Sequence, residues 1–152
     1  MDTIGTRKLT GWLILLILQL GPLSFVGGVK SLRTVEETYK RYIVQYPSLS
    51  SAIMLFQLLV GAGIAAWAYT AWVLYQREPG TLGKLKIGLV LGFILRIAGV
   101  YTIPLFGGLP PSAAQTIIQN SLPFNFLSFV LISIWYLYLL RSQRVREIYA
   151  AR

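Results

Sequence analysis

The sequence predicts an all-α integral membrane protein folded as a four-helix bundle, and three observations carry that prediction. Hydrophobic residues make up 55% of the 152-residue chain and charged residues only 12%, about half the charged share of soluble domains. Mean hydropathy is correspondingly high, at +0.63. Four nearly uncharged segments are each long enough to cross about 30 Å of hydrocarbon as a helix. We therefore expect one membrane domain over residues 1–152, with spans at about 9–29, 51–75, 87–106 and 122–140.

The first predicted span lies between Lys8 and Lys30 and contains no charged residue. At 1.5 Å per residue, this segment covers about 31 Å. It is longer than the apolar region of a signal peptide, and no small-residue cleavage site follows it, so we expect a retained helix. The second span is the most apolar part of the uncharged segment 42–76, the third is interrupted only by Arg96, and the fourth contains no charge.

The two loops on the predicted outer side have helical features of their own. In the first loop, apolar and aromatic residues recur at helical spacing: Val35, Tyr39, Tyr42, Ile43 and Tyr46. This pattern predicts a short amphipathic helix on the membrane surface that ends near Pro47, with a plain solvated connector as the alternative. In the third loop, the break at residues 107–111 precedes a second predicted short surface helix. The predicted fold thus includes short interfacial helices in the outer loops.

The distribution of cations predicts the orientation. If the N-terminus is cytoplasmic, the inner segments hold Arg7, Lys8, Arg77, Lys84, Lys86, Arg141, Arg144, Arg146 and Arg152. The outer segments then hold Lys30, Arg33, Lys40 and Arg41. Because cytoplasmic loops carry the excess of Lys and Arg, this contrast favours cytoplasmic N- and C-termini.

The net charge of +9 does not indicate nucleic-acid binding, because the cations flank apolar segments and do not line one soluble face. Such cations orient membrane helices and contact anionic headgroups. We therefore expect the lipid bilayer and its anionic headgroups as partners, with Arg141, Arg144 and Arg146 in contact with headgroups. A homo-oligomer or a membrane-protein partner is a further option.

The chain contains no histidine and no cysteine. It therefore lacks the usual ligands of zinc, copper, haem and iron–sulfur centres, and it cannot form disulfides. Histidine-based acid–base catalysis and cysteine nucleophiles are excluded as well. We expect no metal, no cofactor and no enzymatic activity.

Arg96 is the most informative residue, because it lies near the middle of a predicted span, where a charge is costly. Gly88, Gly92 and Gly99 share its helical face, and such small residues let another helix approach closely. Arg96 should therefore point into the bundle or into a polar cavity. Two interpretations are equally supported: a binding site for an anion, headgroup or polar solute, or a structural arginine that bonds neighbouring helices.

Uncharged amides are the candidate companions of Arg96, since no carboxylate lies within any predicted span. Gln19 lies at a similar depth, and Gln57 and Asn125 lie in the outer halves of their spans; each can accept hydrogen bonds. The second span also contains a run of glycine and alanine that includes Gly61. That run is typical of close helix packing.

Both ends of the chain carry recognisable motifs. Residues 9–15 read Leu-Thr-Gly-Trp-Leu-Ile-Leu and are followed by Gly21-Pro22-Leu23, and residues 135–146 form an aromatic helix that runs into Ser-Gln-Arg-Val-Arg. These segments resemble the opening and closing signatures of domain-of-unknown-function family 2569. That family consists of small bacterial inner-membrane proteins with four predicted spans. The resemblance implies a bacterial cytoplasmic membrane and the same architecture, and it implies no activity.

Two functions fit these observations. The first is a non-enzymatic structural, accessory or assembly component of the membrane, with self-association as an option, because catalytic groups are missing and packing glycines are abundant. The alternative is a small transporter or channel that binds an anionic or amphipathic solute or lipid near Arg96. A cavity around Arg96 would favour the alternative, and a dry, closed bundle would favour the first. A lipid-directed enzyme ranks third, since nothing near Arg96 could serve as a base.

Overall fold

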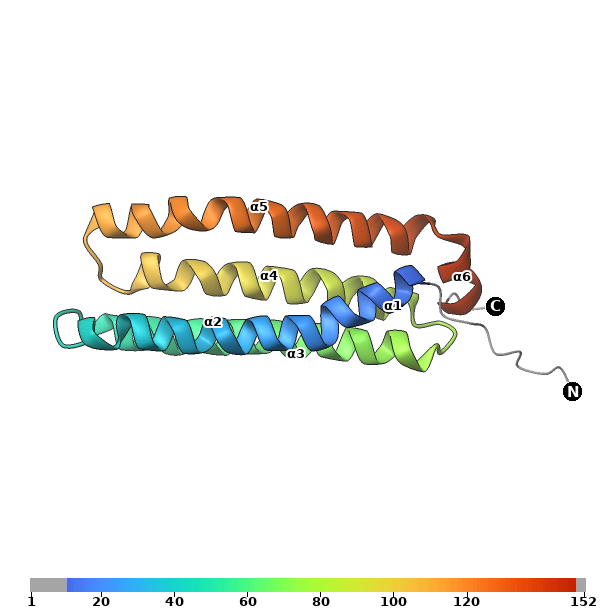
Figure 1. The fold of residues 1–152 in the computed structure, drawn as a ribbon, viewed down its shortest axis with the longest axis horizontal. Coiled ribbons are helices and arrows are strands. Elements are labelled where there is room, and N and C mark those ends of the chain that lie inside the picture. The colour runs from blue at the N-terminus through green and yellow to red at the C-terminus, as the bar shows by residue number, and fades with distance from the viewer. Residues whose placement is uncertain (1–10, 150–152) are drawn as a thin grey trace, which may run out of the picture.

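The computed structural model describes residues 11–149, which form long helices packed side by side along one axis (Figure 1). In chain order the elements are α1 (Gly11–Leu18), the π-helical segment η1 (Gln19–Leu23), α2 (Ser24–Tyr39), the 3-10 turn η2 (Lys40–Tyr42), α3 (Ser48–Gln76), α4 (Leu82–Phe106), α5 (Pro111–Arg141) and α6 (Gln143–Tyr149). Residues 9 and 10 of the first predicted span lie outside the described residues.

Within residues 11–149, four helical units are long and apolar enough to cross a membrane: Gly11–Tyr42, Ser48–Gln76, Leu82–Phe106 and Pro111–Arg141. These units correspond to the four predicted spans, so the all-α membrane bundle is confirmed. The start of α1, the α3–α4 connection and α6 lie at one end of the bundle, and η2 and the α4–α5 connection lie at the other (Figure 1). We call these the α6 end and the η2 end.

The predicted separate short helices in the outer loops are wrong, because both are extensions of spans. The amphipathic segment of the first loop continues α2, and its apolar residues Leu32, Val35 and Tyr39 pack against buried residues of α3. That face is therefore covered by protein and not by a membrane surface. The second helix is the first part of α5, which begins with Pro111 at its first turn, a position where proline costs no backbone hydrogen bond.

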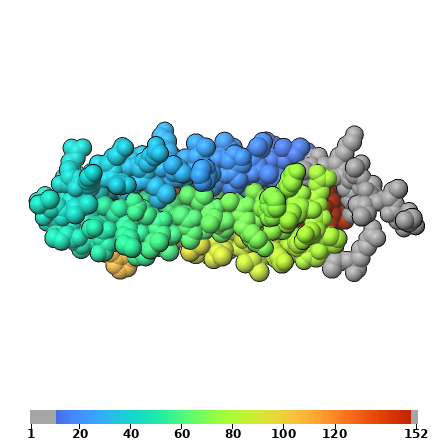
Figure 2. All heavy atoms as spheres, turned by 90° about the horizontal axis from the view of Figure 1, so that it is seen from below, coloured from blue at the N-terminus to red at the C-terminus, as the bar shows by residue number. Residues whose placement is uncertain are grey.

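The first helical unit is bent where η1 joins α1 to α2. Pro22 lies inside η1, and proline has no N–H to donate within a helix, so a local change from α- to π-helical bonding accommodates it. α2 lies along α3, whereas α1 turns across α4 toward the end of α5 that joins α6 (Figure 1). Figure 2 shows the first unit, in blue, lying beside α3, in green, along the length of the bundle. This bend separates α2 from α5 on one side of α4.

The tightest packing joins α3 to α4, and it depends on glycines. A Cβ at Gly99 would lie 2.7 Å from Val60 Cγ2, and one at Gly88 or Gly92 would overlap Thr70 or Trp67. Gly61 does not contribute as predicted, because a Cβ there would meet nothing within 4 Å. Gly63, half a turn further along α3, faces α4 instead. The prediction for Gly61 placed the contact on the wrong face of α3.

Candidate functional site

Arg96 occupies the middle of α4 and lies between three other helical units. Its Cγ would be 2.6 Å from a Cβ at Gly63, so the absence of a side chain there makes room for the aliphatic part of the arginine. Its Nη1 donates to Ser24 Oγ in α2 at 3.4 Å. Its guanidinium carbon lies 4.7 Å from the centroid of the Trp67 ring in α3. Arg96 is thus held over an aromatic face at a distance typical of a cation–π contact.

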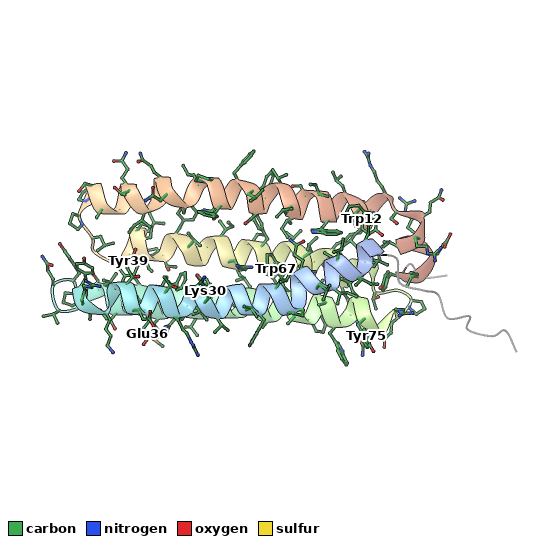
Figure 3. All side chains as sticks on the ribbon, viewed as in Figure 1. Trp12, Lys30, Glu36, Tyr39, Trp67 and Tyr75 are labelled. Carbon is green, nitrogen blue, oxygen red and sulfur yellow. The ribbon has the colours of Figure 1, made fainter. Side chains whose placement is uncertain are left out.

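Trp67 is a fixed platform for this guanidinium. Its Nε1 donates to the backbone oxygen of Leu89 at 3.0 Å, and the residue is 7% exposed. Gly92 allows the ring to lie against α4, because a Cβ at that position would overlap Trp67 Cδ1. Figure 3 shows Trp67 near the middle of the bundle's length, between α3 and α4. The sequence therefore builds the platform from one aromatic residue and two glycines, Gly63 and Gly92.

A cavity of about 190 Å³ adjoins the guanidinium. It is lined by Gln19, Leu23, Ser24, Gly27, Trp67, Arg96, Ser128, Leu131 and Ile132. These residues come from η1, α2, α3, α4 and α5. Among the lining residues, Leu23 in η1 is 67% exposed and Leu131 in α5 is 38% exposed. These exposed lining residues indicate that the cavity opens between the η1–α2 unit and α5.

The cavity closes where α1 meets α5. Gln19 Oε1 accepts a hydrogen bond of 2.7 Å from Trp135 Nε1, which joins η1 to α5. The ring of Trp12 packs edge-on against Trp135 with centroids 6.0 Å apart. The amide oxygen of Gln19 is thus engaged, and its NH2 group is what Gln19 can offer to a ligand. The exposed lining residues Leu23 and Leu131 lie on the open side of the cavity.

Two of the predicted ligand-binding amides lie elsewhere. Asn125 donates through Nδ2 to the Tyr101 hydroxyl at 3.0 Å and to Ser121 Oγ at 3.4 Å, so it joins α5 to α4. Gln57 lies ten residues before Trp67 on α3, about 15 Å along the helix axis, and it does not line the cavity. Both residues lie in the outer halves of their spans, as predicted, and at that distance along the helices neither of them lines the cavity beside Arg96.

Three lining residues that carry polar groups were not predicted as part of the site: Ser24, Trp67 and Ser128. Trp67 had a signal, since tryptophan is typical of membrane interfaces and this one lies in the middle of an apolar span among alanines. The two serines had none, because hydroxyls are common on membrane helices. Their side chains become significant only when the bundle brings α2 and α5 to the same arginine.

The predicted headgroup arginines lie at the α6 end, and their environments differ. Arg141 and Arg144 are exposed. Arg146 donates from Nε and Nη2 to the backbone oxygen of Leu140, at 3.1 and 2.7 Å, so it satisfies a carbonyl in the last turn of α5.

The helix α6 is anchored at its start and along one face. Ser142 Oγ accepts a hydrogen bond of 3.4 Å from the backbone N–H of Val145 at the start of α6. Val145, Ile148 and Tyr149 are buried against the other helices.

The polar side chains that line the cavity can donate hydrogen bonds to a ligand. Arg96 is the one charged side chain among the described residues that line it, and the polar groups around it are two hydroxyls and an amide. A guanidinium has five N–H donors in a planar fork that fits carboxylate and phosphate oxygens. The arrangement can hold an anion, and its apolar walls can hold the hydrocarbon attached to one.

No curated protein and no solved structure significantly matches the chain. The family model of DUF2569, described as a protein of unknown function, matches residues 6–150, as the resemblance at both ends of the chain predicted. The chain is therefore a multi-pass membrane protein that belongs to the DUF2569 family.

Proposed function

We propose that this protein is a small bacterial inner-membrane carrier that binds an anionic solute or lipid at Arg96, within the membrane. The cavity beside Arg96 is the observation that carries the proposal. A closed bundle would have supported the structural or assembly role, whereas a partly open cavity around an intramembrane arginine favours binding. The proposed role is binding without catalysis. The lining residues offer hydrogen-bond donors, and none of them is a carboxylate or a histidine that could serve as a base.

Spare donors on Arg96 support binding over a purely structural role. Among the described residues, the hydrogen bond of the guanidinium is the one to Ser24, at 3.4 Å. A structural arginine in a dry bundle would use most of its five N–H groups on carbonyls and amides, because each unsatisfied group costs about 1–3 kcal/mol. No fully buried side-chain nitrogen or oxygen among the described residues lacks a partner. The remaining donors of Arg96 therefore face the cavity, where a ligand could accept from them.

The orientation remains part of the proposal. With the α6 end in the cytoplasm, Arg77, Lys84 and Lys86 of the α3–α4 region and the arginines near α6 are on the inner side. That arrangement agrees with the excess of cations on cytoplasmic segments. Arg141 and Arg144 are then exposed where anionic headgroups would lie.

The test compares Arg96→Lys and Arg96→Leu for thermal stability and for bound anion, measured by native mass spectrometry after gentle extraction. We expect Lys to keep the fold and lose the anion, because an ammonium lacks the planar fork, and we expect Leu to lose it too. Arg141→Leu is the matched control, since it removes an exposed arginine outside the cavity and should keep the anion. Equal anion content in all four proteins would show that Arg96 only joins helices.

A further inference from the structure

We propose that the ligand is a phospholipid whose singly charged phosphodiester lies against Arg96 and whose acyl chains leave the cavity sideways, between α2 and α5. This inference rests on the proposed function and names the ligand class of the same site. Three features of the cavity lead to it: the depth and position of its opening, its charge, and its size together with its donors.

The opening lies at a depth where the surroundings are hydrocarbon. Arg96 is ten residues beyond Lys86, about 15 Å along α4, which is half of a hydrocarbon core about 30 Å thick. The residues at the edge of the opening, Leu23 and Leu131, are apolar and exposed. Gly27, in α2, is exposed and has no neighbour within 4 Å of the position of a Cβ. A ligand that enters here must bring hydrocarbon with it, because a free ion would have to leave water and cross lipid.

The single positive charge of the site favours a ligand that carries one negative charge. Arg96 is the one cation among the described lining residues, and no carboxylate lines the cavity with it. A buried charge without a partner costs several kcal/mol, so the ligand should neutralise the arginine and bring no excess. A phosphodiester carries one negative charge. A phosphomonoester carries about −1.5 to −2 at neutral pH, which would leave the excess uncompensated at this depth.

The size of the cavity and its donors favour a phosphodiester over a carboxylate. A volume of about 190 Å³ is many times the roughly 10–15 Å³ that a cavity needs to hold one water molecule. A carboxylate would fill only part of that space. A phosphate with its ester oxygens fills more of it and presents more acceptors. Those acceptors match the fork of Arg96 together with the hydroxyl groups of Ser24 and Ser128.

The first experiment compares four probes with the full chain in detergent micelles: phosphatidylglycerol, phosphatidic acid, oleate and inorganic phosphate. The affinity for each probe is measured by native mass spectrometry titration on the wild type and on Arg96→Gln. Both proteins have the same exposed arginines, so the difference in affinity between them reports binding at Arg96. We expect phosphatidylglycerol to bind at one site that Arg96→Gln weakens at least tenfold. The other three probes should show at least tenfold weaker Arg96-dependent binding.

The second experiment tests the side opening with a matched pair of substitutions. Gly27→Leu places a side chain in the mouth of the cavity, where no protein atom would clash with its Cβ. Gly61→Leu makes the same change at another helical glycine with open space around it, away from the cavity. We expect Gly27→Leu to weaken phosphatidylglycerol binding at least fivefold at unchanged thermal stability, and Gly61→Leu to leave binding unchanged.

The outcomes separate the two proposals. If phosphatidic acid or oleate is the tightest Arg96-dependent ligand, the binding function stands and the phosphodiester assignment is overturned. If inorganic phosphate binds as tightly as the lipid, or if Gly27→Leu binds lipid like the wild type, entry from the side is overturned. If no probe binds in an Arg96-dependent manner, the proposed function fails together with this inference.

Discussion

The guanidinium of Arg96 stacks on the ring of Trp67, with 4.7 Å between the guanidinium carbon and the ring centroid. Trp67 is itself fixed to α4 through its hydrogen bond to the backbone of Leu89. A desolvated cation–π contact is worth about 2 kcal/mol or more, which offsets much of the roughly 2.5–3.5 kcal/mol that insertion scales assign to a charge at this depth. The arginine is therefore held in place by contacts within the protein itself.

Gly92→Ala should displace Trp67 and destabilise the protein. The added Cβ would overlap the indole ring, and overpacking of this kind costs about 1–3 kcal/mol. Gly61→Ala is the control, because its Cβ would meet nothing within 4 Å, and alanine favours a helix over glycine by up to about 1 kcal/mol. Thermal unfolding in detergent should therefore give a lower Tm for Gly92→Ala and an equal or higher Tm for Gly61→Ala. An unchanged Tm for Gly92→Ala would show that the α3–α4 contact is looser than described.

Trp67→Phe should weaken both anion binding and the fold. Phenylalanine keeps an aromatic face but is a weaker cation–π partner than tryptophan, and it cannot donate to Leu89. We expect a loss of about 1 kcal/mol of stability from the hydrogen bond and at least a threefold loss of affinity for an anionic lipid. Trp72→Phe, at an exposed tryptophan on the same helix, is the control for both measurements. Wild-type affinity in Trp67→Phe would show that the stacking does not position Arg96.

Tyr149 should make the docking of α6 sensitive to high pH. Burial raises the pKa of its phenol to about 12, against the opposing effect of the nearby positive charge of Arg77. Because the folded-state pKa lies above the ordinary value of about 10, the folded state holds this proton more tightly than the unfolded state. The stabilisation is complete below pH 10 and is lost as the pH rises toward 12. It amounts to about 2–3 kcal/mol for a shift of about two pKa units, since one unit is 1.36 kcal/mol.

Tyr149→Phe isolates this contribution from the titration of other groups. The substitution removes the hydrogen bond that the tyrosine hydroxyl donates to the backbone oxygen of Leu74, so it should cost about 1 kcal/mol at pH 8. The difference in unfolding free energy between the wild type and the variant should close and then change sign between pH 10 and pH 12, because only the wild type has this phenol to titrate and its expected loss exceeds 1 kcal/mol. Denaturant unfolding across that range measures this difference. A constant difference would mean that Tyr149 titrates normally.

Single cysteines should report the orientation without background, because the chain contains none of its own. Gln143→Cys lies at the start of α6 and Ser112→Cys lies at the start of α5, and both positions are exposed. We expect a membrane-impermeant thiol reagent to label position 112 in spheroplasts and to label position 143 only in inverted vesicles. The opposite pattern would reverse the topology.

The four spans could be predicted because hydropathy depends on local composition, and the helices of the bundle lie where the charge-free segments are. The lengths of the helices could not be predicted from hydropathy in the same way. The apolar face at Leu32, Val35 and Tyr39 fits a membrane surface as well as it fits a protein groove, and only the path of α3 shows which one covers it. The break between loop and span was therefore placed where the helix in fact continues.

The candidate site was predictable in part. Arg96 and Gln19 were recognised because charge and amide groups are unusual at membrane depth, and both line the cavity. The partners of Arg96 depend on the bend at Pro22 and on the face that each helix presents, which no local pattern encodes. Gly61 and Gly63 illustrate the limit: both belong to one small-residue run, and only the second adjoins Arg96.

The side-chain Nε–H resonance of Arg96, in an NMR spectrum of the 15N-labelled protein, would report directly on the proposed binding of an anionic lipid group to Arg96 within the membrane. The signal that disappears in Arg96→Lys identifies the residue. We expect phosphatidylglycerol to shift this signal in a saturable manner at one lipid per chain, and phosphatidylcholine at the same concentration to shift it much less. If the Arg96 signal stays in place while the exposed arginines respond to phosphatidylglycerol, Arg96 does not bind the lipid.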